Sequence, residues 1–229
     1  MKGSFSGAMG GEGGVGEGKP GRRLFGRFVL MLFVLSVGWE VFAQTSGDLM
    51  HRRNSAGPQG PLIQLFQKAV VATKEGDWKT IEEQVQQISG RLGEYKKNLG
   101  IDLTSTIQKA VAAKNGGEVL KYLAEVVYLD MRMQFKMIIA SKLDDFLNAK
   151  ERLDLAREYY DVILSGNVKR KAPNRHEKIE SSFLVAQGAL GNPGFYVDLP
   201  FSPPNVRGFE AASKTIETEI AAIYTYFKG

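Results

Sequence analysis

The chain has 229 residues, a formal net charge of +5 at neutral pH and no cysteine. The absence of cysteine excludes thiol catalysis, iron–sulfur clusters and covalent haem attachment. Residues 1–43 hold five of the 30 basic and three of the 25 acidic residues, so residues 44–229 hold 25 and 22, a formal charge of +3. This near balance gives no reason to expect a nucleic acid as a partner.

The first 43 residues have the order of features found in export signals. A Gly-rich stretch leads to three arginines between positions 22 and 27, and an apolar run over 28–38 follows them. That run is too short to span a membrane, which takes about 20 apolar residues. The segment closes on Val41, Phe42 and Ala43, with small or modest residues at the two positions that signal peptidase reads. We therefore predict a signal peptide over 1–43 and a periplasmic or secreted protein that begins at Gln44.

Two alternatives remain open for this segment. Trp39 and Phe42 lengthen the apolar stretch, which would suit an uncleaved amino-terminal anchor. The arginine pair at 22–23 is also similar to a twin-arginine export signal, although Gly26 stands where such signals have a large apolar residue.

Residues 44–60 are polar and turn-rich and predict a flexible lead-in to one helical domain over 61–229. Pro61 suits the first position of a helix, where a missing N–H costs nothing, and Gly76 ends that helix. Asp77 is expected to cap a second helix over 77–99. This helix has apolar residues at alternating spacings of three and four, the pattern of a bundle helix. These apolar residues are Trp78, Ile81, Val85, Ile88, Leu92, Tyr95 and Leu99.

A short predicted helix over 102–114 precedes the stretch 118–164, which contains no Gly or Pro. An unbroken helix of that length would be about 70 Å long at 1.5 Å per residue. We therefore expect a break between 140 and 148, near Asp144 and Asp145. The part before the break is apolar over a wide arc, so we expect it to be the central helix.

Ser165 and Gly166 are expected to end this helical stretch, with a basic connector over 168–173. Asn174 and Glu177 have the spacing of a capping box and predict the start of the next helix.

A Pro-rich loop over 195–208 and a last helix over 206–227 complete the chain. No segment shows the sustained period-two alternation that is typical of strands. The sequence thus predicts an all-α fold, an up-and-down helical bundle of about six to seven helices.

His176 and Glu180 lie four residues apart on a predicted helix, with Glu177 beside them. A histidine and a glutamate at that spacing can both reach one metal ion. Two ligands do not complete a site, so the alternative is a helix-start histidine that is hydrogen-bonded to a loop.

Asp130 interrupts the inner apolar row of the expected central helix. Burial of an unpaired carboxylate would cost several kcal/mol, so Asp130 needs a partner. The partner is either a cation or tyrosine hydroxyl of the protein, or a bound metal, for which Glu125 on the same helix could supply a second carboxylate. His176, Glu180, Asp130 and Glu125 are thus the candidate metal ligands.

Other charged and aromatic residues have simpler explanations. Acidic residues spaced three or four apart over 151–161 are interleaved with Arg152 and Arg157, which is typical of a solvated helix face. The methionines and tyrosines suit core packing. No phosphate-binding loop, nucleophile elbow or Ser/His/Asp order is present, so we do not expect an enzyme.

Four segments carry a resemblance to known proteins: GDW at 76–78, YLDM at 128–131, AREYYDVIL at 156–164 and IETEIAAIYTYF at 216–227. In style these resemble periplasmic helical domains associated with bacterial iron uptake, namely the soluble part of iron-permease-type proteins and the imelysin-like group. The resemblance spans most of the chain after residue 43. The Arg-Glu iron motif and the transmembrane part of the permeases are absent, which puts transport itself in doubt. A lesser similarity is to extrinsic photosystem subunits with a four-helix bundle.

The resemblance implies an exported accessory or binding protein for iron or another divalent cation. The alternative is a ligand-free structural or interaction subunit that docks on a membrane complex of the cell envelope, through a helix face or the loop 195–208.

The export signal leads to a direct prediction. Protein recovered from its native host should begin at or next to Gln44, because the predicted cleavage site directly follows the small residue Ala43. Intact-mass measurement checks this, and a membrane-bound form that retains residues 28–43 would show an anchor instead.

Overall fold

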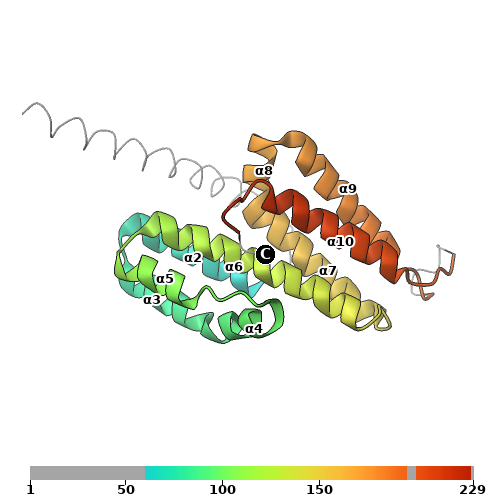
Figure 1. Ribbon diagram of the computed structural model, residues 1–229, viewed down its shortest axis with the longest axis horizontal. Coiled ribbons are helices and arrows are strands. Elements are labelled where there is room, and N and C mark those ends of the chain that lie inside the picture. Colours follow the sequence, from blue (N-terminus) through green and yellow to red (C-terminus); the bar gives the residue numbers. More distant parts are fainter. Residues whose placement is uncertain (1–59, 195–199, 228–229) are drawn as a thin grey trace, which may run out of the picture. The chain divides into compact units, whose positions relative to one another are not determined.

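The computed structural model describes residues 60–194 and 200–227, which are almost entirely helical (Figure 1). The predicted signal peptide lies outside the described residues, as does the lead-in apart from Gly60, which is buried. Within the described ranges the only pairing of extended chain is an isolated bridge between Asn192 and Ser202. The predicted all-α bundle is confirmed. In the same ranges no helix is both long and apolar enough to cross a membrane.

The described helices follow one another with short connections. In chain order they are α2 (Pro61–Glu75), α3 (Trp78–Gln87), α4 (Ser89–Leu99), α5 (Thr104–Ala112), α6 (Gly116–Ala140), α7 (Phe146–Tyr159), the π-helical segment η2 (Tyr160–Leu164), α8 (Ser165–Lys171), α9 (Pro173–Ala189) and α10 (Val206–Ala221). Short helices at breaks in longer helical stretches raise the number of elements above the six to seven expected.

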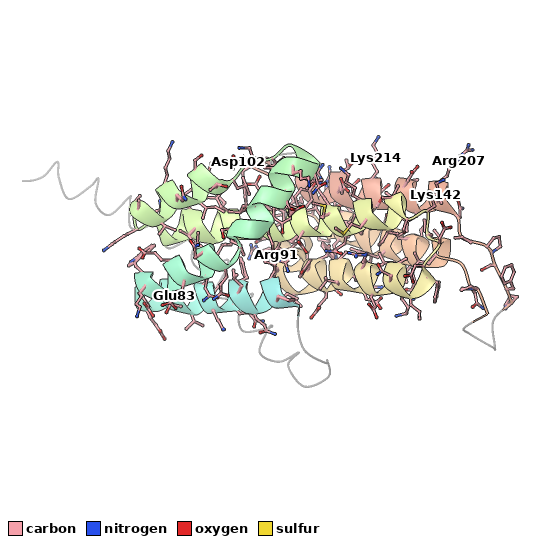
Figure 2. The ribbon with its side chains drawn as sticks, turned by 90° about the horizontal axis from the view of Figure 1, so that it is seen from below. Glu83, Arg91, Asp102, Lys142, Arg207 and Lys214 are labelled. Carbon is pink, nitrogen blue, oxygen red and sulfur yellow. The ribbon has the colours of Figure 1, made fainter. Side chains whose placement is uncertain are left out.

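Helix α6 is the central helix, as predicted. It packs against α2, α4, α5, α7, η2 and α10. In Figure 1, α2, α3 and α5 lie toward the amino-terminal end of α6, and α7, α9 and α10 lie toward its carboxy-terminal end. Helix α4 contacts α6 past its middle, at Asp130 and Lys136. The buried apolar side chains of these helices form one cluster. Charged side chains such as Glu83, Lys142 and Lys214 lie on the outside (Figure 2).

The predicted break between 140 and 148 is confirmed. The chain turns between α6 and α7 through Lys142 and Leu143, whose φ angles are 53° and 62°. Such left-handed backbone is strained for side chains with a Cβ, and burial of Leu143 in the core offsets that cost. Asp145 then caps α7 by accepting a hydrogen bond from the backbone N–H of Asn148 at 3.1 Å.

The single helix predicted over 77–99 is instead two helices. Asp77 caps α3 as predicted and accepts a hydrogen bond from the Thr80 backbone N–H at 3.1 Å. The helix then breaks at Ile88, where φ is −92° and ψ is 0°. Ser89 and Gly90 follow directly, and the low helix propensity of glycine explains the position of the break. Ile88 stays buried, so the apolar row continues across it.

The region after α7 differs from the prediction in two respects. Ser165 and Gly166 do not end the helical stretch, because η2 continues into α8 and the expected connector is mostly helical. The Ser165 hydroxyl donates to the Asp161 carbonyl at 2.7 Å, which satisfies a backbone acceptor inside this stretch. The predicted capping box is also wrong, since α9 begins at Pro173 and Asn174 lies inside it.

The last helix is shorter than expected and ends at Ala221. Residues 222–227 form turns, in which the Phe227 ring stacks on the rings of Tyr128 and Tyr224 at 4.8 and 4.6 Å between centroids. Helix α10 is fastened to α9 by Glu219, whose carboxylate pairs with Arg175 and with Lys178.

The packing of α4 can be tested at Leu92, which is 3% exposed. Leu92→Ala should lower the free energy of unfolding by about 2–5 kcal/mol, because it leaves a cavity in the core. Lys97→Ala on the exposed side of the same helix should change it by less than about 0.5 kcal/mol. Urea unfolding followed by circular dichroism measures both, and similar small effects would contradict the packing.

Candidate functional site

Asp130 lies on α6 and is buried, with an exposure of 2%. Its Oδ1 accepts hydrogen bonds from Arg91 Nη1 at 2.9 Å and from the Tyr95 hydroxyl at 2.7 Å. Its Oδ2 accepts from Gln134 Nε2 at 3.2 Å. The prediction that this carboxylate has a partner is confirmed, and the described partners are a cation, a tyrosine and an amide of the protein itself.

The Asp130 cluster joins two helices through residues one turn apart. Arg91 and Tyr95 share one side of α4, and Asp130 and Gln134 share one side of α6, because residues four apart are neighbours on a helix surface. Burial, followed by the charge of Asp130, raises the pKa of the Tyr95 phenol well above its usual range. The phenol therefore remains protonated and donates to the carboxylate.

The cluster extends from α6 to α7 through Arg152. This guanidinium donates through Nη1 to Gln134 Oε1 at 2.8 Å and through Nε to Asn148 Oδ1 at 2.5 Å. The charge pattern over 151–161 predicted a solvated face for Arg152, whereas in the structure Arg152 connects α6 and α7. Asp130 thus belongs to a polar cluster that links α4, α6 and α7.

Glu125 does not join this cluster. Five residues along a helix correspond to about 140° around its axis, so Glu125 and Asp130 project from different sides of α6. Glu125 is fully buried. It lies near Tyr128, whose pKa burial raises to about 12, with contributions from Glu217 and Glu125 against the opposing effect of Arg132. The two carboxylates of the predicted bundle site are therefore apart.

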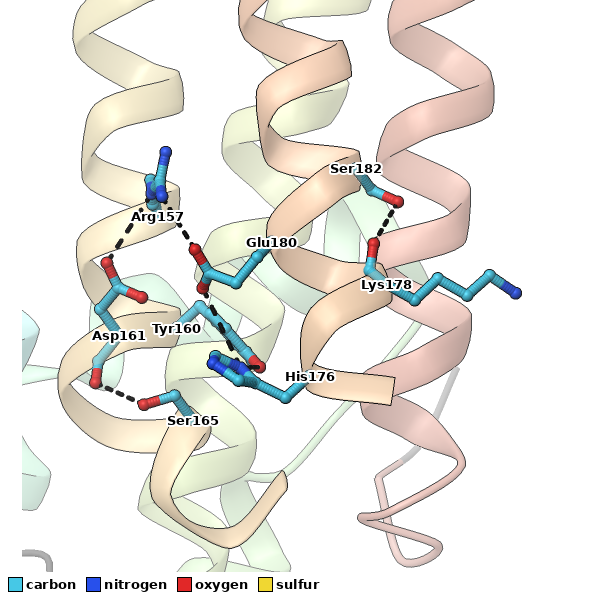
Figure 3. Close-up of polar contacts among 8 residues, drawn as sticks. All are labelled: Arg157, Tyr160, Asp161, Ser165, His176, Lys178, Glu180 and Ser182. Carbon is cyan, nitrogen blue, oxygen red and sulfur yellow. Dashed lines mark hydrogen bonds and ion pairs between the residues drawn. The ribbon is translucent and has the colours of Figure 1, made fainter. Parts of the chain in front are cut away.

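His176 and Glu180, in contrast, lie together where η2 meets α9 (Figure 3). His176 Nδ1 is 4.0 Å from Glu180 Oε1 and 2.6 Å from the hydroxyl oxygen of Tyr160. The Tyr160 and His176 rings are stacked, with centroids 5.8 Å apart. Three side chains of metal-ligating or titratable type thus meet at one place, and we call them the Tyr160–His176–Glu180 cluster.

Arg157 holds the other side of the Glu180 carboxylate. Its Nη2 donates to Glu180 Oε2 at 2.9 Å, and its Nε lies 3.8 Å from Asp161 Oδ2. Glu180 Oε1, on the side of His176, is buried and has no hydrogen-bond partner. One oxygen of this carboxylate is therefore satisfied by the protein and the other is not.

Burial keeps the imidazole of His176 neutral near pH 7. Burial lowers the histidine pKa, as does nearby Lys169, while Glu180 and Glu177 oppose the change. Burial, with the charges of Glu180 and Asp161, raises the pKa of the Tyr160 phenol above its usual range. Both groups are therefore neutral, and the direction of the hydrogen bond between the phenol and Nδ1 follows the imidazole tautomer: the phenol donates when the ring proton is on Nε2.

The π-helical segment η2 begins at Tyr160 and provides the local geometry of the cluster. π-helical turns are rare and occur frequently at functional sites. From the sequence, Tyr160 was expected to pack in the bundle core and Arg157 to lie on a solvated helix face. The signal that could have found the cluster is the pair Tyr159 and Tyr160, both fully buried, since adjacent residues of a regular amphipathic helix rarely both face the core.

Over the described ranges 60–194 and 200–227, no three His, Asp or Glu side chains are grouped so as to hold a metal ion. Of the four candidate ligands, the structure brings together His176 and Glu180. It places Asp130 among donors from α4 and α6, and Glu125 on another side of α6.

The Asp130 cluster yields a stability prediction. Asp130→Asn should lower the free energy of unfolding by about 1–3 kcal/mol, because Arg91 loses its counter-charge and a buried donor loses its acceptor. The matched control is Asp154→Asn, which removes an exposed carboxylate that pairs with Lys150, and it should cost less than about 1 kcal/mol. Chemical denaturation at neutral pH measures both, and equal costs would show that burial adds nothing at Asp130.

Comparison of the chain with protein-family models, with curated proteins and with solved structures finds no match. The resemblance to periplasmic helical domains therefore stays a prediction, and the candidate site stands on its own geometry.

Proposed function

We propose that this chain is an exported helical-bundle accessory protein of the cell envelope that binds iron or another divalent cation at His176 and Glu180. The observation that supports it is the approach of His176 Nδ1 to within 4.0 Å of a buried carboxylate oxygen that has no hydrogen-bond partner.

The two groups suit a cation in chemistry and in spacing. Imidazole nitrogen and carboxylate oxygen are common ligands of iron, zinc and manganese. Each such ligand lies about 2.0–2.2 Å from the metal, so two atoms 4.0 Å apart can contact one ion after a small rotation of either side chain. The neutral state of His176 matters here, because only the neutral imidazole binds metal.

Arg157 determines what kind of binding this site can support. Its guanidinium is bonded to the second oxygen of Glu180 and brings a positive charge close to the ion. That charge weakens cation binding. The arrangement therefore favours a site that loads and releases its ion over a permanent structural metal.

The second candidate function is a ligand-free interaction subunit that docks on a membrane complex. The observation that favours it is a set of exposed large apolar residues on α9 and in the segment after it. They are Leu184, Val185 and Phe201, at 60%, 57% and 74% exposure. Adjacent exposed apolar side chains of this kind are typical of contact surfaces when they gather into a patch.

A thermal-unfolding experiment distinguishes the two functions. Protein comprising residues 44–229, freed of metal with a chelator, should show a higher melting temperature in Fe²⁺, Mn²⁺ or Zn²⁺, because a ligand stabilises the state that binds it. His176→Ala and Glu180→Gln should abolish the rise. Glu177→Gln, an exposed neighbour on the same helix, should keep it.

Asp130→Asn serves as a second control. It should lower the melting temperature without metal and leave the metal-dependent rise unchanged, because Asp130 lies in a different cluster. If none of the ions raises the melting temperature of the unmodified chain, the cation-binding function is wrong and the interaction subunit takes its place.

A further inference from the structure

We propose that Tyr160 is a third ligand of this site and that the ion it selects is ferric iron. The inference rests on the proposed function, because it adds a ligand and an ion preference to the His176 and Glu180 site. It starts from the phenol oxygen of Tyr160, which lies 2.6 Å from His176 Nδ1 (Figure 3).

Tyr160 is positioned as a ligand would be. Its hydroxyl forms a hydrogen bond with Nδ1 of His176, and Glu180 Oε1, which has no hydrogen-bond partner, lies 4.0 Å from the same nitrogen. The phenol oxygen of Tyr160 on η2 and two atoms from α9, His176 Nδ1 and Glu180 Oε1, therefore lie close together. The stacked rings of Tyr160 and His176 bring the two donor atoms to the same end of the pair.

The donor set indicates the charge of the ion. Phenolate is an anionic oxygen ligand used by proteins to hold iron. Together with the Glu180 carboxylate it supplies two negative charges, which suit an ion of charge +3 better than one of +2 when Arg157 stands nearby. Water or a small anion would occupy the remaining positions.

Binding of the ferric ion requires one proton to leave. The O–H bond of Tyr160 breaks, the oxygen binds iron, the proton passes to solvent, and no electron is transferred. Nδ1 of His176, in the tautomer whose ring proton is on Nε2, then directs its lone pair to the ion. A divalent ion bound through His176 and Glu180 alone would displace the Tyr160 hydroxyl from Nδ1, because the single lone pair of that nitrogen cannot serve both.

Visible absorption provides the test. Protein comprising residues 44–229 is mixed with ferric citrate near pH 7, and the tyrosinate-to-iron charge-transfer band is recorded. We expect the band in the unmodified chain and its loss in Tyr160→Phe. The circular dichroism spectrum of Tyr160→Phe should match that of the unmodified chain, which shows that the variant folds.

Tyr159→Phe is the matched control. Tyr159 is the adjacent residue and equally buried, but the raised pKa of its phenol is set by burial and by the charge of Asp130, so it belongs with the other cluster. This variant should keep the band. A band that persists in Tyr160→Phe, or a band that is lost in Tyr159→Phe alone, would overturn the assignment of Tyr160.

The failure of this inference and that of the proposed function give different results. A divalent rise in melting temperature without a ferric band in the unmodified chain would overturn Tyr160 as a ligand and leave the cation site intact. The absence of both the band and the rise would overturn the cation site as well.

Discussion

Helix α6 is enclosed by other helices, so a polar group on its buried sides needs a partner within the protein. Asp130 is the strongest case, because an unpaired carboxylate at that depth would cost several kcal/mol. Arg91 and Tyr95 from α4 meet this requirement by donating hydrogen bonds to Asp130. Gln134 on α6 also accepts a hydrogen bond from Arg152 on α7. Rotation or sliding of either helix on α6 would break these bonds. The pairing therefore sets the register in which the helices before and after α6 pack on it.

The two polar clusters use similar residue types and differ in how completely they are satisfied. Both oxygens of Asp130 accept hydrogen bonds from side chains of the protein. At Glu180 one oxygen is bonded to Arg157 and the other has no donor. A carboxylate whose oxygens both accept hydrogen bonds stabilises a fold and gains little from a ligand. A carboxylate with one oxygen that lacks a donor, beside a neutral imidazole, has that oxygen available to bind a cation. This contrast separates the structural ion pair from the candidate site.

The turn from Tyr159 to Tyr160 serves both clusters at once. The phenol of Tyr159 lies within the influence of Asp130 and Arg91, whereas that of Tyr160 bonds His176 on α9. The change from α-helix to π-helix falls between these two residues.

The features that depend on local rules could be predicted from the amino-acid sequence. Hydrophobic periodicity placed the helices, Asp77 predicted a cap, the long stretch without Gly or Pro predicted the turn before Asp145, and burial cost predicted a partner for Asp130. Tertiary structure decided which partner, because Arg91 lies 39 residues away and spacing rules compare only neighbours on one helix. It also decided that Tyr160 meets His176, since their contact depends on the π-helical turn and on the packing of α9 beside it. Local patterns thus specify which residues need partners, and only the packing of helices distant in the chain supplies them.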